Sequence, residues 1–273
     1  MSAAATSAVT VVVSQTRYNL LATVRAGSAI ALGIVMPVVF YLGASALFGS
    51  DAMGGDSPVA VRGAGEAPDL RTFYVGGFMA YAVIYSAFVA LLPDVVDIRE
   101  RGLLKRLRGT PLPLATFVAA RFAIAALITT IGVAVIAALG WAVFDVPARA
   151  GALAGLAVYT LAGTVTFACL AFAATTITRT QSGAQGFSNG VGILLAMISG
   201  VFFAPGILPD RVRSIAQVLP LEPLANGFQS HYVTGASGVG LDAGNLGILA
   251  AWTIAAIAVV ALSGFRWQPR QQR

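Results

Sequence analysis

The residues able to carry acid–base, nucleophilic or metal chemistry are few in this chain and stand far apart. Among 273 residues there is one histidine, His231, and one cysteine, Cys169. A disulfide within the chain and a metal site built from several His or Cys side chains are therefore excluded. The long apolar stretches contain Ser and Thr but no Asp or Glu, which argues against an intramembrane hydrolase and a proton-coupled antiporter. The sequence predicts no catalytic, cofactor or metal site here, and a surface or interface position for His231.

A nucleotide site of the P-loop type is excluded as well. That loop needs a lysine in Gly-Lys-Ser or Gly-Lys-Thr, because the lysine must reach the phosphates. Lys105 is the only lysine, and it stands between Leu104 and Arg106. Any ATP hydrolysis that drives this protein must therefore take place in another polypeptide.

Residues 94–113, DVVDIRERGLLKRLRGTPLP, form a dense cluster of charge. Asp97, Arg101 and Lys105 recur at four-residue spacing and would share one face of a helix. A group of leucines would lie on another face of the same helix. This group consists of Leu103, Leu104 and Leu107. The spacing predicts a short amphipathic helix on the inner membrane surface, which Pro111 would end.

Two interpretations of this helix stay open. It could be an anchor whose positive charges are held on the cytoplasmic side. It could instead dock a cytoplasmic partner, with charges that set orientation and leucines that fill a groove.

Composition places these residues in a membrane protein. Apolar residues make up 58% of the chain and charged residues only 10%, against about 25% charged residues in soluble domains. A soluble globular enzyme, a disordered tail and a disulfide scaffold are excluded. The net charge is +6, and the charged residues lie in short stretches between apolar runs. We therefore expect contact with membrane lipid and no nucleic-acid partner.

Six stretches without Asp, Glu, Lys or Arg are each at least 22 residues long, enough to cross a bilayer core as helices. They lack the alternation of a membrane β-barrel. We expect an all-α membrane protein, with one transmembrane domain over residues 1–273. The expected transmembrane helices cover 27–48, 73–93, 120–144, 151–175, 185–204 and 245–265.

Basic residues set the predicted orientation. Alternate loops, counted from the N-terminus, carry 12 basic and 3 acidic residues on one side, and 5 basic and 8 acidic residues on the other. Both termini are therefore expected in the cytoplasm, and Arg121 at the inner end of the third span is expected to reach the headgroups or a partner. The preference for arginine over lysine, together with the high content of alanine and glycine, suggests a bacterial protein. We therefore expect it in the bacterial plasma membrane.

Two stretches are expected to lie along the membrane rather than cross it. Residues 1–25 have no basic region before an apolar core, so they are predicted as a cytoplasmic lead-in and not a cleaved signal peptide. Residues 205–243 are apolar but interrupted by prolines, and are predicted to re-enter the outer leaflet under cover of other helices.

Several side chains within the spans could contact cargo. Tyr81, Tyr85 and Phe88 are spaced to share one face of the second span, and Asn189 could bond across the fifth. Phe202 and Phe203 could form an apolar gate at the outer end of the fifth span. Ordinary packing and interfacial anchoring are the alternatives for all of them.

The order of motifs after the second span resembles that of the type-2 ABC exporter permeases. This family includes permeases for drugs, polysaccharides and lipids. The resemblance rests on RERG at 99–102, LLKRLR at 103–108 and TPL at 110–112. Met36-Pro37 in the first span and Leu219-Pro220 before the last span extend it over nearly the whole chain.

The resemblance implies a separate ATPase subunit, which would hold ATP and Mg, and a second permease copy or paralogue. Residues 12–25 would form an elbow helix, and residues 206–230 the external re-entrant helices. The first, second and fifth spans would line a path between two permeases. The residues that would couple to the ATPase are Asp97, Arg99, Glu100, Arg101, Gly102, Leu103, Leu104, Lys105 and Arg106.

The predicted function is therefore the permease subunit of an ATP-driven exporter. Its cargo would be amphipathic, drug-like or lipid-like, because the spans offer apolar and aromatic walls without fixed charge. The alternative is a structural membrane protein or a passive channel that works without an ATPase.

Overall fold

The computed structural model describes residues 31–48, 70–102, 114–146, 150–202, 209–233 and 240–263. Within these ranges the chain is helical and contains no strand, which confirms the expected all-α class. The expected elbow, residues Leu103–Arg106 of the coupling segment, and Phe203 lie outside the described residues.

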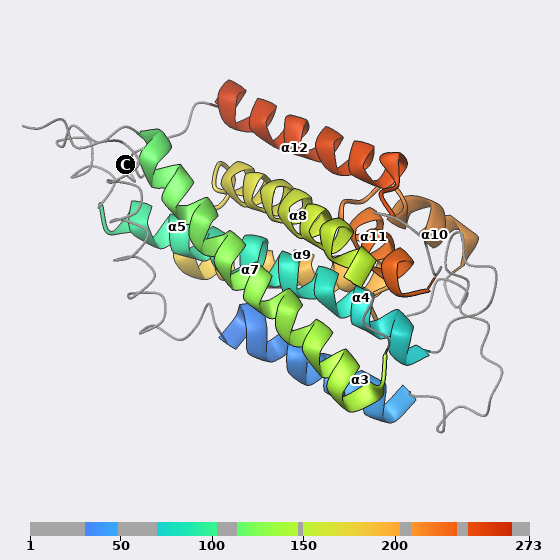
Figure 1. Cartoon of the computed structure of the whole chain (residues 1–273). Coiled ribbons are helices and arrows are strands. Elements are labelled where there is room, and N and C mark those ends of the chain that lie inside the picture. The colour runs from blue at the N-terminus through green and yellow to red at the C-terminus, as the bar shows by residue number, and fades with distance from the viewer. Residues whose placement is uncertain are drawn as a thin grey trace, which may run out of the picture.

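The elements follow one another as helices of very different length (Figure 1). Their bounds are η1 Ala31–Val35, α3 Met36–Phe48, α4 Leu70–Ile84, η2 Tyr85–Ala90, α5 Leu91–Glu100, α7 Leu114–Phe144, η3 Ala150–Ala152, α8 Leu153–Ala174, α9 Gln181–Ile198, α10 Asp210–Ala216, α11 Leu221–Val233 and α12 Ala243–Ser263.

One long helix, made of α4, η2 and α5, forms the centre of the bundle. It contacts α3, α7, α8, α9 and α11, and its side chains from Phe73 to Val89 are buried. Its 30 residues from Arg71 to Glu100 extend about 45 Å at the helical rise of 1.5 Å per residue. A bilayer core is about 30 Å thick, so the helix is long enough to cross it and continue beyond.

Four described helices are long and apolar enough to cross a membrane. They are Arg71–Glu100, Thr116–Phe144, Leu153–Ala174 and Ala243–Ser263. These helices correspond to the expected second, third, fourth and sixth spans. The first expected span is represented by the shorter apolar helix Gly33–Leu47.

The fifth expected span, 185–204, differs from the others in its first half. Helix α9 is 18 residues long and begins with the polar and glycine-rich sequence QSGAQGFSNG. It ends before Ser199 and Gly200, where Gly200 has a φ of +70°, a conformation that favours glycine. The absence of charged residues predicts this span. Because its first half is polar, however, α9 is less apolar than the four long helices named above.

The π-helical segment η2 changes which residues share a face of the central helix. A π-helix has more residues per turn than an α-helix, so side chains beyond it are rotated relative to the regular pattern. Tyr81 and Tyr85 still meet, with ring centroids 4.3 Å apart. Phe88 lies within η2 and lines a groove together with Phe167 and Trp252. The regular spacing of 3 and 4 residues therefore does not describe this turn.

Helix α11 lies within the expected external segment 205–243 and is buried against α4 and α8. Gly76 makes the close approach possible, because a Cβ at this position would lie 2.5 Å from the Gln229 backbone nitrogen. His231 is only 4% exposed, with its ring edge-on to Tyr159 at 5.7 Å. The structure thus buries His231, a residue of α11, against Tyr159 of α8 rather than placing it at the surface.

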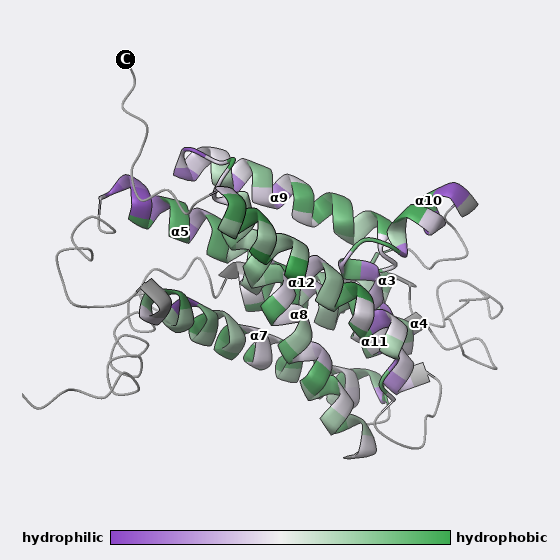
Figure 2. Ribbon diagram, turned by 90° about the horizontal axis from the view of Figure 1, so that it is seen from above, coloured by the Kyte–Doolittle hydropathy of each residue, from purple (hydrophilic) through white to green (hydrophobic). Residues whose placement is uncertain are grey.

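Polar residues concentrate at the ends of the bundle, as Figure 2 shows for α5 and α10. The ends of α5 and α8 and the start of α9 lie at the same end of the bundle, whereas α10 lies at the opposite end (Figure 1). We call the end with Glu100 the α5 end. Of the segments predicted to be cytoplasmic, the described residues 94–102 and 175–181 lie at this end.

Candidate functional site

The α5 end holds three charged side chains that bond to three other helices. Arg99 reaches the turn after α8, where it donates 2.7 Å and 2.5 Å hydrogen bonds to the carbonyl oxygens of Thr175 and Thr178. The carbonyl groups at a helix C-terminus lack partners within the helix and carry partial negative charge. A guanidinium with several donors in a fixed fork satisfies them and complements that charge.

Glu100, the next residue, bonds to the start of α9. Its Oε2 accepts a 2.9 Å hydrogen bond from the Gln181 backbone nitrogen. The Thr180 hydroxyl accepts a second bond, from the Gly183 nitrogen, and so caps the same helix. A carboxylate at a helix N-terminus is favoured by the helix dipole. Arg99 and Glu100 therefore hold the two ends of a single turn, residues 175–181, which joins α8 to α9.

A third charged residue, Asp94, lies less than two turns earlier on α5. Arg121 of α7 donates to its Oδ2 at 2.5 Å, and the Arg121 side chain is only 11% exposed. The guanidinium also lies 5.5 Å from the centre of the Phe117 ring, within range of a cation–π contact. Arg121 is thus paired inside the chain, and the expectation that it extends to the headgroups or a partner is wrong.

The end of α5 leads directly into the rest of the expected coupling segment. Asp97 accepts a 2.9 Å bond from Arg101 Nε, an exposed pair one turn apart. Gly102 has a φ of +69°, which ends the helix. Residues 94–100 therefore continue the central helix, and the expected single surface helix over 94–113 is wrong in this first part.

Tyr81, Tyr85 and Phe202, three of the residues predicted for the path and the gate, come together in one aromatic cluster. Tyr81 contacts Phe202 with centroids 5.3 Å apart, and Phe40 of α3 packs edge-on against both rings. Tyr81 and Tyr85 are almost fully buried. In the single chain these rings pack against one another instead of lining an open path.

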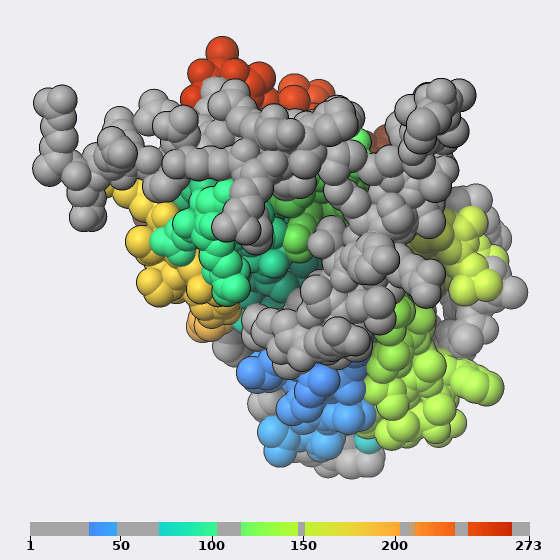
Figure 3. All heavy atoms as spheres, turned by 90° about the vertical axis from the view of Figure 1, so that its left-hand side faces the viewer, coloured from blue at the N-terminus to red at the C-terminus, as the bar shows by residue number. Residues whose placement is uncertain are grey.

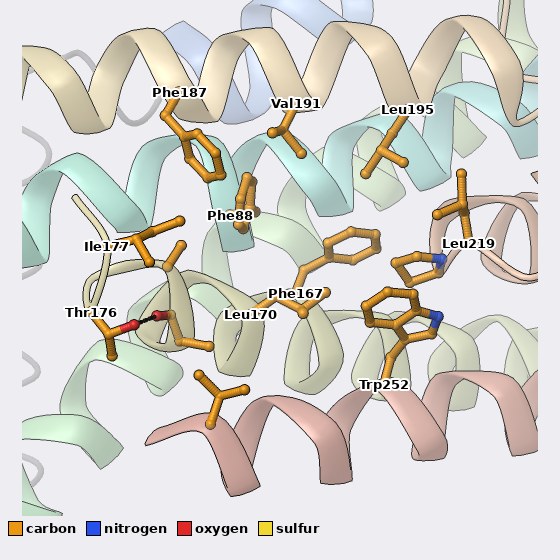
Figure 4. A pocket seen from close by; sticks show the side chains of 14 residues that line it. Phe88, Phe167, Leu170, Thr176, Ile177, Phe187, Val191, Leu195, Leu219 and Trp252 are labelled. Carbon is orange, nitrogen blue, oxygen red and sulfur yellow. Dashed lines mark hydrogen bonds between the residues drawn. The ribbon is translucent and has the colours of Figure 1, made fainter. Parts of the chain in front are cut away.

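Phe88 belongs to a different feature, an apolar groove of about 360 Å³ (Figure 4). One wall comes from α9 with Phe187, Val191 and Leu195, and the facing side includes Trp252 of α12. The groove is open to the outside of the bundle and is lined almost entirely by apolar side chains. The half-buried Asn189 belongs neither to this wall nor to the aromatic cluster described above.

Helix α9 packs on the central helix through small side chains. Its buried residues recur every four positions, which allows close approach of the backbones. They are Ala184, Ser188, Gly192 and Ala196. The Ser188 hydroxyl donates to the Val89 carbonyl at 3.2 Å, so this serine bonds within the chain. Figure 3 faces the α5 end and shows α5 lying beside α9.

The sequence did not indicate the partners of Arg99, Glu100 and Asp94. Two of these side chains bond to backbone atoms 76 to 81 positions away, and backbone atoms have no residue-type signal. The run of Thr175, Thr176, Thr178 and Thr180 in the 175–181 turn is the available hint, because hydroxyl residues favour caps and turns.

Comparison with known proteins assigns the chain to a family. Residues 10–232, which include every described contact of Arg99, Glu100 and Asp94, match the family described as ABC-2 type transporter. A comparison with curated proteins gives no match. Members of this family are membrane transport subunits that are not themselves catalytic and generally work with an ABC ATPase. The match covers more than half of the chain, which therefore belongs to the ABC-2 type transporter family.

Proposed function

We propose that this chain is the permease subunit of an ATP-driven exporter and that residues 97–106 receive work from a separate ATPase. The observation that carries the proposal is the family match over residues 10–232. The single lysine supports it, because Lys105 is not part of a P-loop and the chain therefore needs an outside source of energy.

The proposed topology has six spans with both termini in the cytoplasm of a bacterium. The α5 end, with the 175–181 turn, would then face the cytoplasm, and α10 would face outside. The excess of basic residues in the 94–121 loop supports this orientation. Residues 205–243 would form the external re-entrant segment, for which the burial of α11 is the supporting observation.

The proposed assembly has two permeases and two ATPases. An exposed face of α9 supports pairing with a second copy, since Leu194 is 60% exposed and a Cβ at Gly186 or Gly190 would meet nothing within 4 Å. Small residues of this kind allow two helices to approach closely in a membrane. Opening between copies would expose the aromatic cluster around Tyr81 and Phe202 to amphipathic cargo.

Purification from native membranes tests the proposal. The tagged chain should retain an ATPase with Walker motifs in mild detergent, identified by mass spectrometry. Leu104→Asp should reduce the retained ATPase at least about tenfold, because a charge replaces a leucine expected to fill an apolar groove. Leu241→Asp, at an exposed leucine before α12, is the matched control and should retain it. A chain purified without any ATPase, or equal retention by both variants, would contradict the proposal.

A further inference from the structure

The 175–181 turn is fastened to the end of the central helix by opposite charges at its two ends. Arg99 bonds to the carbonyl groups of Thr175, the C-cap of α8, and of Thr178 farther along the turn, and Glu100 bonds to the first backbone nitrogen of α9. We call these two side chains together the charge clamp. Each charge has the sign that complements the helix end it contacts.

The contacts of the clamp determine what must move together. Beyond the clamp, α9 follows the central helix through its small-residue face, and Ser188 bonds to the Val89 carbonyl in η2. The central helix and α9 are therefore joined at two levels, through the charge clamp in α5 and through the Ser188 bond in η2. Helix α7 is joined to α5 separately, through the pair between Arg121 and Asp94.

We propose that Arg99 and Glu100 are positioning residues that make α5 and the start of α9 move as one body, so that displacement of residues 97–106 reaches the transport path through α9. This inference rests on the proposed function. It assigns the two residues a role inside the permease, where their side chains are engaged, in place of direct contact with the ATPase. The exposed Arg101 and the leucine-containing sequence that follows it remain the part proposed to meet the ATPase.

The geometry explains why both charges are needed. If only Glu100 were present, the carbonyl groups of Thr175 and Thr178 in the turn after α8 would lose the hydrogen bonds that Arg99 donates. If only Arg99 were present, the first backbone nitrogen of α9 would lose its bond to α5, and the small-residue face and the Ser188 bond alone would hold the start of α9. The turn would then absorb the displacement instead of transmitting it.

The test uses the permease–ATPase complex in lipid nanodiscs and liposomes. Arg99→Ala and Glu100→Ala should each lower the amount of dye transported per ATP hydrolysed by at least about fivefold. This is a conservative value for the loss of a hydrogen bond to a charged group. A fluorescent amphipathic dye serves as the transported probe. Arg99→Lys and Glu100→Gln should recover part of the ratio, because each keeps one polar contact. Arg211→Ala, at an exposed arginine of α10, is the control and should match the unaltered chain.

A distance measurement separates this inference from the proposed function. Spin labels at Arg101→Cys and Ser182→Cys, in a Cys169→Ser background, report the separation of α5 and α9. Their distance should stay narrow in the parent chain through ATP binding, and should broaden in Arg99→Ala even in the permease alone. A parent distance that changes with ATP, or an unchanged distribution in Arg99→Ala, would overturn the inference. Absence of a bound ATPase would refute the proposed function. The distances in the permease alone would still show whether Arg99 holds α5 and α9 together.

Discussion

Charged side chains at the α5 end connect the central helix to its neighbours. Arg99, Glu100 and Asp94 were recognisable in the sequence as part of a charged segment, and the four-residue spacing of Asp97 and Arg101 indicated the helical turn on which the structure pairs them. Their other partners could not be predicted, because these bonds depend on how α7, α8 and α9 pack around the central helix. The same limit applies to His231, whose burial follows from the close approach of α11 to Tyr159.

The Asp94–Arg121 pair gives a prediction at this scale. Arg121→Gln should lower the free energy of unfolding by about 1–2 kcal/mol, between the values of an exposed and a buried ion pair, because Asp94 is left without its cation. The melting temperature in detergent measures the effect. Asp94→Asn combined with Arg121→Gln should recover at least half of the loss. If the double variant were as unstable as the sum of the two single variants, the pair would not be energetically coupled.

At the scale of helices, uncharged length predicted the positions of the four long spans because an apolar helix must cover the bilayer core. Uncharged length is a weaker guide to α9, whose polar first half packs on α5 through small residues. Uncharged length also gives no sign of η2, because a π-helical turn has no residue pattern of its own. The π-helical turn changes the spacing after Ile84, and Phe88 lines the apolar groove whereas Tyr81 and Tyr85 belong to the aromatic cluster.

The packing of α11 against α4 gives a second prediction. Gly76→Ala should destabilise the protein by about 1–3 kcal/mol, the usual cost of overpacking, because the new methyl group would overlap the Gln229 backbone. Gly43→Ala on α3 is the matched control, since its Cβ would meet nothing within 4 Å. Thermal unfolding of the two variants in the same detergent provides the comparison. Equal melting temperatures would mean that α11 does not approach Gly76 as closely as described.

At the scale of the whole molecule, the chain has a long central helix whose α5 end is bonded to the neighbouring elements. Composition and charge order were sufficient to predict a membrane protein, and the motif order after the second span predicted the family that residues 10–232 match. The sequence does not predict which cargo is carried, because the aromatic cluster and the apolar groove are built from side chains that suit many amphipathic molecules.

We propose that this chain transports with energy taken from another polypeptide. The test is ATP hydrolysis by the purified chain in nanodiscs, measured alone and after addition of the ATPase that co-purifies with it. We expect no hydrolysis above background from the chain alone, and hydrolysis that responds to transported dye once the ATPase is bound. Hydrolysis by the chain alone, or ATP-driven dye transport in liposomes that contain no other protein, would contradict the account.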